Sequence, residues 1–484
     1  MKVKVLYILI SALPFLLLCL VCGCAVNPVT GQSELMLLSE QDELQLGRQT
    51  EQSVIKEYGV YDDPGLQGYV QGVARPLAGV SHRPTLPWQF KVMDSPVVNA
   101  FAAPGGYVFI TRGLLAAVND EAELAGVLAH EIGHVTARHS ARNYSQSLLA
   151  NFGVQLGTAL AGSYGNVLGP LLEAGTGLLF LKYSRDDERQ ADALGVEYAT
   201  KAGYDSNRMA DFFATLQRQE TLPGERGSGL PEWFSTHPSP VDREAAVRSQ
   251  TAQWRSRLPS QSFRVNRDAY LDKVDGLLYG DDPRQGFREG EWFYLPRYQV
   301  QFRIPAQWTF EREGSQAQMV HPQKAGVILF NIQTGNIDQV ARSFVASLQA
   351  RVEQSRERTV NGLRARELLA TISDGRQRLR VTSYFYQKGG EVFIFHGLSG
   401  EQEFPRLAET LAQPANSFAA LTDQAKLNRQ PRRITIKRVN QPGTLEGVLQ
   451  SYKIDSRDWP VIAWLNEIQP GSQVAAGQRI KIIQ

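Results

Sequence analysis

The sequence predicts a multidomain α+β protein, with a mainly helical domain that holds a small sheet, a second α+β domain and a small βααβ module. Three patterns support this class. Apolar residues recur at helical spacing around 120–139, residues alternate as in strands between 298 and 395, and a strand-helix-helix-strand order ends the chain. A chain of 484 residues with 43% hydrophobic content has room for two to four globular units. We expect a leader and three domains, at residues 1–23, 24–258, 263–422 and 431–484.

The charges of the chain are balanced, with 51 basic and 49 acidic residues. This balance produces no electrostatic field that would attract a polyanion. We therefore expect no nucleic-acid partner.

The first 23 residues are typical of a secretory signal, because Lys2 and Lys4 precede an apolar run at 5–21 that is too short for a membrane span. The next residues, Val21-Cys22-Gly23-Cys24, resemble a bacterial lipobox. This predicts acylation of Cys24 and attachment to the membrane by lipid, and Ala25 resembles the sorting rule for the outer membrane. Cys19 and Cys22 lie in this leader and Cys24 follows it directly, so the mature chain would keep one cysteine and form no disulfide. An ordinary cleaved signal or an N-terminal anchor helix is the alternative.

The segment after the leader predicts a turn, a helix and two strands. Residues 27–31 are turn-forming and are expected to be a short tether from the lipid. Ser39 and Asp42 are placed to cap a polar helix that extends to Tyr58. The two strands are predicted where β-forming residues gather, at 88–93 and 107–111.

A helix that begins at Asp120 carries the most informative motif of the chain. Asp120 and Glu123 form a start like a capping box, and apolar residues every three to four positions form a buried stripe of Leu124, Val127, Leu128, Ile132 and Val135. His130 and His134 project from one face of this helix, with Glu131 beside them. The H-E-x-x-H pattern predicts a zinc site with a built-in base. The alternative is a surface helix with two histidines.

A catalytic zinc site needs three protein ligands and an open fourth position. In the H-E-x-x-H-x-x-G-x-x-H pattern the third histidine would fall at position 140, which is Ser140 here. The remaining candidate is a carboxylate of a later helix, where Asp192 follows Glu188 by one turn. Glu188 would bind the metal, and Asp192 could accept the second N–H of a ligand histidine and fix its tautomer. Alternatively, these acids belong to a solvated helix face.

Four ordered motifs lie within residues 34–250. They are Asn99-Ala100-Phe101-Ala102, Gly106-Tyr107-Val108-Phe109-Ile110-Thr111, His130-Glu131-x-x-His134 and Glu188-x-x-x-Asp192. With these motifs the chain resembles the zinc metallopeptidases of the CAAX prenyl protease, HtpX and BepA type, which are gluzincins. The resemblance implies a zincin-type protease domain, one Zn²⁺ and endopeptidase activity. It also implies metal ligands at His130, His134 and Glu188, a general base at Glu131 and a supporting role for Asp192.

Two further predictions concern the substrate and the reaction. An edge strand beside the active-site helix can pair with an extended substrate, and the candidate is Tyr107, Val108, Phe109, Ile110 and Thr111; an interior strand is the alternative. His237 lies in a Thr-His-Pro segment that resembles one of the family, and Arg243 matches the arginine that follows it. His237 could stabilise an oxyanion, occupy the open position of the zinc in a resting state, or have a structural role. The other histidines are expected to be ordinary surface or packing residues: His82, His139, His321 and His396.

Residues 143–172 contain no charge, which raises the possibility of a membrane span. Their glycines, Pro170 and scattered polar residues argue against one, and a single crossing would separate Glu188 from His130. We expect helices that pack over the site.

The second domain is expected to contain strands and two amphipathic helices, with Lys388-Gly389-Gly390 as a hairpin turn. The strands are predicted at 298–304, 326–332, 363–372, 379–386 and 391–395, and the helices at 337–352 and 405–421. No catalytic pattern occurs there. Substrate docking and mere spacing are both open as its role.

The tail resembles a divergent LysM module, a class that binds peptidoglycan. The resemblance rests on Pro442-Gly443-Thr444-Leu445 after the first strand and Gly477-Gln478-Arg479-Ile480 before the last. Its elements are predicted at 434–437, 444–452, 459–465 and 480–483. The aspartate that follows the first glycine in the class is absent here, so a structural cap is the alternative to peptidoglycan binding.

These features together predict a zinc metalloendopeptidase, anchored by lipid at the periplasmic face of the outer membrane. Pairing through the main chain ignores side-chain identity and needs unfolded substrate, so unfolded or misfolded envelope proteins are the expected substrates. Two alternatives from other classes are a lipid-anchored chaperone or scaffold with a structural zinc, and a peptidoglycan-binding envelope protein.

Overall fold

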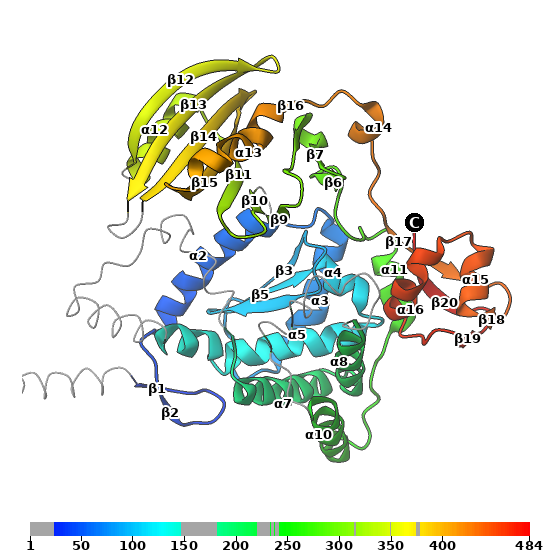
Figure 1. Ribbon diagram of the computed structural model, residues 1–484. Coiled ribbons are helices and arrows are strands. Elements are labelled where there is room, and N and C mark those ends of the chain that lie inside the picture. The colour runs from blue at the N-terminus through cyan, green and yellow to red at the C-terminus, as the bar shows by residue number, and fades with distance from the viewer. Residues whose placement is uncertain are drawn as a thin grey trace, which may run out of the picture.

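A computed structural model describes residues 24–146, 182–219, 233, 237, 242–313, 316–348, 350–373 and 378–484. Figure 1 shows a central group of helices around a small sheet, a curved antiparallel sheet above it, and a small module at the C-terminal end. The predicted α+β class with several sheets is confirmed. In this part of the chain no helix combines the length and the apolar character needed to cross a bilayer. The predicted leader lies outside the described residues.

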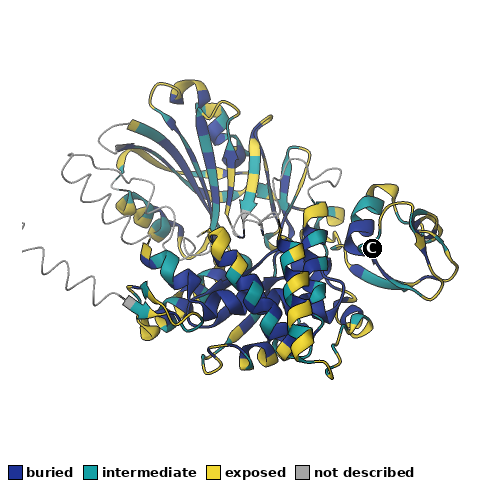
Figure 2. Cartoon of the chain, turned by 90° about the horizontal axis from the view of Figure 1, so that it is seen from below, coloured by how far each residue is buried: buried dark blue, intermediate teal, exposed yellow. Residues whose placement is uncertain are grey.

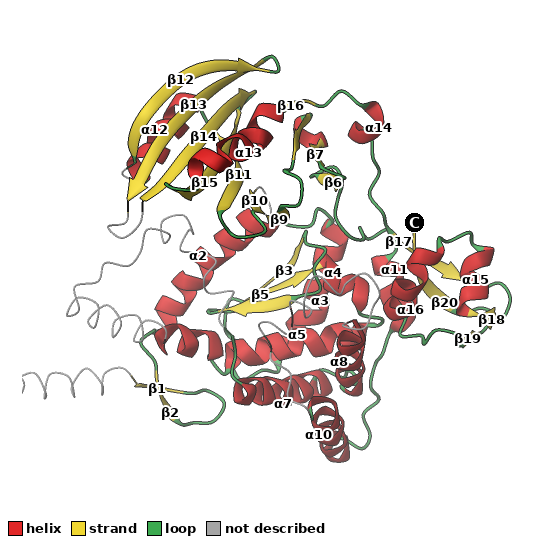
Figure 3. Cartoon of the chain, in the orientation of Figure 1, coloured by secondary structure: helices red, strands yellow, loops and turns green. Residues whose placement is uncertain are grey.

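The helical domain packs its helices around a three-stranded sheet (Figure 3). The order of the sheet is β3 (Gln89–Met93), β5 (Tyr107–Thr111) and β4 (Ala100–Ala103). The helices are α2 (Glu40–Tyr58), α3 (Pro64–Gly79), α4 (Arg112–Ala117), α5 (Glu121–Thr136), α7 (Arg185–Lys201), α8 (Asn207–Gln219), α10 (Arg243–Arg257) and α11 (Arg267–Val274).

Helix α5 runs through the centre of this domain, and all of its residues are buried. Figure 2 shows how the buried residues gather in the interior of the helical part of the molecule. As predicted, Asp120 caps it, because its side chain accepts a hydrogen bond of 2.9 Å from the backbone N–H of Glu123. Helix α5 approaches α7 closely at Gly133, where a Cβ would lie only 3.1 Å from the carbonyl oxygen of Ala191. The glycine therefore allows two functional helices to lie side by side.

Strand β5 lies in the middle of the small sheet, parallel to β3 and antiparallel to β4. The prediction that Tyr107 to Thr111 form an edge strand is therefore wrong. The local sequence favours a strand, but the neighbours of a strand depend on the whole fold. Among the described strands, β4 is the edge strand that lies against α5.

An N-terminal hairpin of β1 (Cys24–Val26) and β2 (Ser33–Leu35) is docked on the helical domain. The turn between the strands is built on Asn27, whose Oδ1 accepts a hydrogen bond of 2.8 Å from the N–H of Val29. The Nδ2 of Asn27 donates to the carbonyl oxygen of Ala137, just after α5, at 3.3 Å. The expectation of a tether at 27–31 is wrong, because its turn-forming residues make a tight hairpin.

The second domain contains a seven-stranded antiparallel sheet, in the order β12-β13-β14-β15-β11-β10-β9, and a four-stranded sheet, in the order β16-β8-β7-β6. Two helices pack on opposite faces of the large sheet, since Phe385 belongs to the cluster of α12 and the next residue, Tyr386, to that of α13. The elements are β6 (Phe287–Glu289), β7 (Trp292–Leu295), β8 (Val300–Arg303), β9 (Thr309–Glu313), β10 (Gln316–Val320), β11 (Gly326–Thr334), α12 (Ile337–Ser347), β12 (Arg351–Val360), β13 (Leu363–Ser373), β14 (Arg378–Lys388), β15 (Glu391–Gly400), α13 (Phe404–Ser417), β16 (Ala419–Ala420) and α14 (Gln424–Leu427).

Most of the predicted elements of this domain are present, including the hairpin turn at Gly389. Strand β12 differs from the prediction, which extended the preceding helix to 352. This strand forms the edge of the sheet and is almost entirely exposed, so its sequence shows no apolar alternation.

The C-terminal module shows the predicted strand-helix-helix-strand order, with its first and last strands paired antiparallel. It also shares one hydrophobic core with the helical domain, and the N–H of Ile434 donates to the carbonyl oxygen of Leu277 at 2.8 Å. The predicted boundaries at 258 and 431 therefore do not separate independent cores, and α11 belongs to the helical domain. The elements are β17 (Ile434–Arg438), β18 (Gly443–Thr444), α15 (Leu445–Ser451), α16 (Trp459–Leu465), β19 (Gln473–Val474) and β20 (Arg479–Ile483).

Candidate metal centre

Two imidazoles from α5 form one side of the site. His130 and His134 lie one turn apart on the same face, and their Nε2 atoms are 3.0 Å apart. Both side chains are fully buried. The two Nε2 atoms therefore point toward a common position.

Helix α7 adds a carboxylate to this position. Glu188 lies in its first turn, which starts with a capping box between Ser184 and Asp187. The Oε1 of Glu188 is 3.4 Å from the Nε2 of His134, and its Oε2 is 3.6 Å from the Nε2 of His130. Glu188 is fully buried, so it is not part of a solvated helix face.

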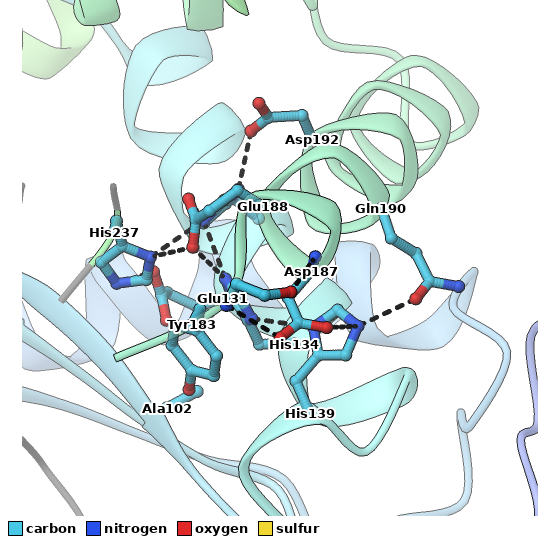
Figure 4. A network of polar contacts seen from close by, with 12 residues as sticks. Ala102, Glu131, His134, His139, Tyr183, Asp187, Glu188, Gln190, Asp192 and His237 are labelled. Carbon is cyan, nitrogen blue, oxygen red and sulfur yellow. Dashed lines mark hydrogen bonds and ion pairs between the residues drawn. The ribbon is translucent and has the colours of Figure 1, made fainter. Parts of the chain in front are cut away.

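His237 completes the group from a separate segment of the chain (Figure 4). Its Nδ1 lies 2.9 Å from the Oε1 of Glu188 and 3.4 Å from the Nε2 of His130, and its ring stacks on Trp233 with centroids 4.4 Å apart. The ligand atoms of the four residues all lie within 4.8 Å of one another. Three imidazoles and a carboxylate are donors suited to a transition-metal ion such as zinc.

The charge of the site fits a divalent cation. Three buried carboxylates, Glu131, Glu188 and Asp192, lie around the buried guanidinium of Arg243, so acidic groups outnumber arginine among the described residues of the site. The Nε2 of His237 finds no hydrogen-bond partner among the described residues, and the Oε2 of Glu188 lies in an ion pair with Arg243 but accepts no hydrogen bond there. Buried polar atoms without partners are costly unless an ion satisfies them.

Glu131 lies beside the four donors without joining them. Its two carboxylate oxygens have no hydrogen-bond partner in the described part of the chain, and its Oε1 is 3.7 Å from the Nε2 of His237. Burial raises the pKa of Glu131 above its usual value. A carboxylate of raised pKa and free lone pairs is suited to accept and return a proton.

The pKa of Glu188 is shifted in the opposite direction. Burial would raise the pKa of Glu188, but the nearby imidazoles of His237 and His134 and the charge of Arg243 together hold it well below its usual range. Glu188 is therefore suited to remain an anionic ligand, while Glu131 is suited to exchange protons.

Asp192 and Arg243 support the site by contacting its donor residues. The Oδ1 of Asp192 lies 2.9 Å from the Nδ1 of His130, which is the contact predicted for it. The Nη2 of Arg243 lies 2.7 Å from the same Oδ1 and 3.2 Å from the Oε2 of Glu188, and its guanidinium stacks 3.8 Å from the ring of Phe213. Arg243 therefore joins the two acids of α7.

Comparison with known proteins agrees with this geometry. The model of peptidase family M48 matches residues 64–251. The mitochondrial metalloendopeptidase OMA1 of Schizosaccharomyces pombe is 31% identical over 269 residues, which cover 55% of this chain and 74% of that protein. The chain belongs to peptidase family M48.

Bacterial members of the M48 family are also similar. The putative beta-barrel assembly-enhancing protease of Vibrio cholerae is 30% identical over 247 residues, which are 45% of this chain and 50% of that protein. The beta-barrel assembly-enhancing protease of Escherichia coli is 29% identical over 266 residues, which are 52% of this chain and 51% of that protein. The chain thus spans about half the length of these two relatives. The predicted family and the metalloendopeptidase class are confirmed at the level of the family.

Within this M48 domain, sequence reasoning missed two neighbours of His134. His139 was expected to be an ordinary histidine, but it is buried and its Nδ1 lies 2.9 Å from the Nδ1 of His134. Tyr183 stacks on His134, with ring centroids 3.8 Å apart. Neither residue stands at a metal-ligand spacing, and the only signal was the position of His139 directly after the motif helix.

The remaining predicted site residues lie elsewhere. Tyr107 to Thr111 form the interior strand β5. The backbone of Cys24 begins the hairpin that docks near the end of α5. The helices expected to cover the site fall mostly within residues 147–181, outside the described residues.

Proposed function

We propose that this M48 protein is a zinc-dependent metalloendopeptidase, attached by lipid in the bacterial envelope, that cleaves unfolded or misfolded envelope proteins. The observation that carries the proposal is the convergence of His130, His134, Glu188 and His237 next to the carboxylate of Glu131, which accepts no hydrogen bond from the described residues. A structural metal site would not need a free carboxylate at this place.

The proposed reaction is hydrolysis of a peptide bond. A zinc ion held by these donors would supply Lewis-acid chemistry, activating water and polarising the carbonyl group of the substrate. Glu131 would take a proton from water through its free carboxylate oxygens and deliver it to the leaving amine. Asp192 would hold the Nδ1 proton of His130, which keeps the Nε2 of that ring available as a ligand.

His237 supplies a fourth protein donor, so we propose that the geometry described here is a resting state. Hydrolysis needs a position for water, and a fourth protein ligand would fill it. When the imidazole of His237 leaves that position it could still donate a hydrogen bond to the developing oxyanion. Both roles require the ring to lie at the site, which favours them over a purely structural turn.

We propose β4 as the strand on which an extended substrate pairs. The N–H of Thr111 donates to the carbonyl oxygen of Asn99, so the odd-numbered residues of this segment bond to β5 and the even-numbered ones face away. The carbonyl oxygen of Ala102 accepts a hydrogen bond of 3.3 Å from Ser140 instead of from a strand. The outward backbone groups of Ala100 and Ala102 are therefore the candidates for pairing with a substrate.

The cellular setting rests on the sequence and on the relatives. The lipobox predicts lipid at Cys24, and two bacterial relatives are named for enhancing beta-barrel assembly. We propose the periplasmic face of the outer membrane as the location. We also propose that the LysM-like tail supports the protease domain, because it shares the core of that domain.

The test is cleavage of an unfolded protein by the purified full chain, compared with the Glu131→Gln variant. The variant should retain its zinc and its fold but lose about 100-fold or more in kcat, because the proton carrier is missing. Glu197→Gln, on the outer part of α7, is the matched control and should cleave normally. The peptidase proposal fails if the wild type does not cleave, or if Glu131→Gln restores envelope function without proteolysis. Either result would favour a chaperone or scaffold function instead.

A further inference from the structure

His139 contacts a metal ligand with one ring nitrogen and helix α7 with the other. Its Nδ1 lies 2.9 Å from the Nδ1 of His134, and its Nε2 lies 2.9 Å from the Oε1 of Gln190 (Figure 4). The ring is fully buried. His139 therefore links the second ligand of α5 to the helix that carries Glu188.

The protons of this chain of contacts can be assigned from its ends. The Nε2 of His134 faces His130 and Glu188, so it must be free of a proton to bind a metal, and its proton must then sit on Nδ1. The Nδ1 of His139 must then accept a hydrogen bond from the Nδ1–H of His134. The Nε2 of His139 then carries the proton of the neutral ring and donates a hydrogen bond to the amide oxygen of Gln190.

The carboxylate of Asp187 favours this direction of the hydrogen bonds over the opposite direction. The Oδ1 of Asp187 lies 3.6 Å from the Nε2 of His139, and an acidic oxygen there stabilises an N–H more than a bare lone pair. If Gln190 instead donated a hydrogen bond through its amide nitrogen, the tautomers of both imidazole rings would be reversed. The proton of His134 would then sit on Nε2, the atom that faces the metal position.

The backbone is shaped to bring His139 to this place. Helix α5 ends at Thr136, and Arg138 then adopts the left-handed conformation with φ of 60°, which is unfavourable for a residue with a side chain. The guanidinium of Arg138 pairs with the buried Glu43 and donates to the carbonyl oxygen of Leu38 at 2.9 Å. These bonds hold the turn that returns the chain toward His134.

We infer that His139 is a positioning residue that acts as a neutral hydrogen-bond acceptor and fixes the tautomer of His134, so that the Nε2 of His134 is free for the metal. The inference rests on the proposed metal-dependent function. His130 already uses the carboxylate of Asp192 for the same purpose.

The experiment measures zinc affinity of the full chain by competition with a chelator, together with the rise in unfolding temperature that zinc produces. His139→Phe keeps a flat ring but has no acceptor, and we expect its zinc affinity to fall about 10- to 100-fold. His139→Asn places an amide oxygen near the position of Nδ1 and should recover most of the affinity. His321→Phe, the same substitution in the second domain, is the matched control and should bind zinc as the wild type does.

A second measurement does not depend on any variant folding. The imidazole ¹⁵N spectrum of the wild type should show His139 neutral, with its proton on Nε2. Zinc affinity of His139→Phe equal to that of the control, or a proton on the Nδ1 of His139, would overturn the inference. A wild type that binds no zinc would instead overturn the proposed function, so the two failures are distinguishable.

Discussion

At the scale of single residues, the site depends on buried charges that balance one another. Arg243 is the clearest case, because it is almost fully buried and pairs with both Asp192 and Glu188. The sequence predicted the ligands His130, His134 and Glu188 and the base Glu131, because such residues follow spacing rules on helices. Arg243 was indicated only by a resemblance, and His139 was expected to be an ordinary histidine. Neither role could be predicted from spacing, because residues that support ligands are placed by turns and by packing.

Replacing Arg243 tests this balance. Arg243→Met leaves two buried carboxylates without their cation, so the free energy of unfolding of the metal-free protein should fall by about 3–5 kcal/mol. Zinc should restore part of this loss, because it supplies positive charge to Glu188. Urea unfolding with and without zinc measures both effects. Arg248→Met removes an exposed arginine on the same helix and should cost about 1 kcal/mol or less; equal losses for the two variants would contradict the account.

At the scale of elements, the site depends on the close packing of α5 against α7. The caps and the apolar stripe of α5 could be predicted, because both are local in sequence. The distance between the two helices could not be predicted, because it depends on Gly133 of α5 meeting Ala191 and Leu194 of α7. The interior position of β5 was missed for the same reason, since the order of strands in a sheet is not a local property.

A single methyl group tests this packing. In Gly133→Ala the new Cβ would lie 3.1 Å from the carbonyl oxygen of Ala191 and 3.2 Å from the Cβ of Leu194, so the helices must separate slightly. We expect a loss of about 1–3 kcal/mol in the free energy of unfolding, with weaker zinc binding as Glu188 moves away from the histidines.

The matched control for this test is Gly72→Ala on α3. Its Cβ would meet no atom within 4 Å, so the higher helix propensity of alanine should leave stability unchanged or raise it by about 0.5–1 kcal/mol. Zinc binding and stability in Gly133→Ala that match those of Gly72→Ala would show that the close approach of the helices is not needed.

At the scale of the whole molecule, the C-terminal module is bound into the helical domain. Lys481 of β20 is fully buried, and its Nζ donates to the carbonyl oxygens of Ala116 at 2.7 Å and Val118 at 2.9 Å, at the end of α4. The Nε1 of Trp464 donates to the carbonyl oxygen of Thr215 on α8 at 2.8 Å. The order of elements in the tail was predictable from its pattern, but its fusion with the first domain was not, because such contacts join residues more than two hundred positions apart.

The buried lysine predicts a pH dependence of stability. Burial lowers the pKa of Lys481 to about 7, whereas an unfolded lysine has a pKa of about 10.4. Between these values the unfolded chain holds a proton that the folded chain lacks, so the free energy of unfolding rises with pH, by up to about 1.4 kcal/mol per pH unit. Lys481→Met removes this contribution.

Urea unfolding of the wild type and of Lys481→Met between pH 7 and 9.5 measures the effect. The advantage of the wild type should grow as the pH rises. Lys437→Met, on the paired strand β17, should keep the pH dependence of the wild type. A difference between the wild type and Lys481→Met that stays constant with pH would show that Lys481 is charged in the folded protein throughout this range.

We propose that side chains of α5 and α7, together with His237, hold one zinc ion per chain. The most direct measurement is zinc-edge X-ray absorption, with metal analysis, on the purified full chain and on a His130→Ala, His134→Ala double variant. We expect one zinc per wild-type chain with only nitrogen and oxygen donors at about 2.0–2.1 Å, and no stoichiometric zinc in the double variant. A wild type without zinc, or a double variant that binds it equally well, would contradict the account.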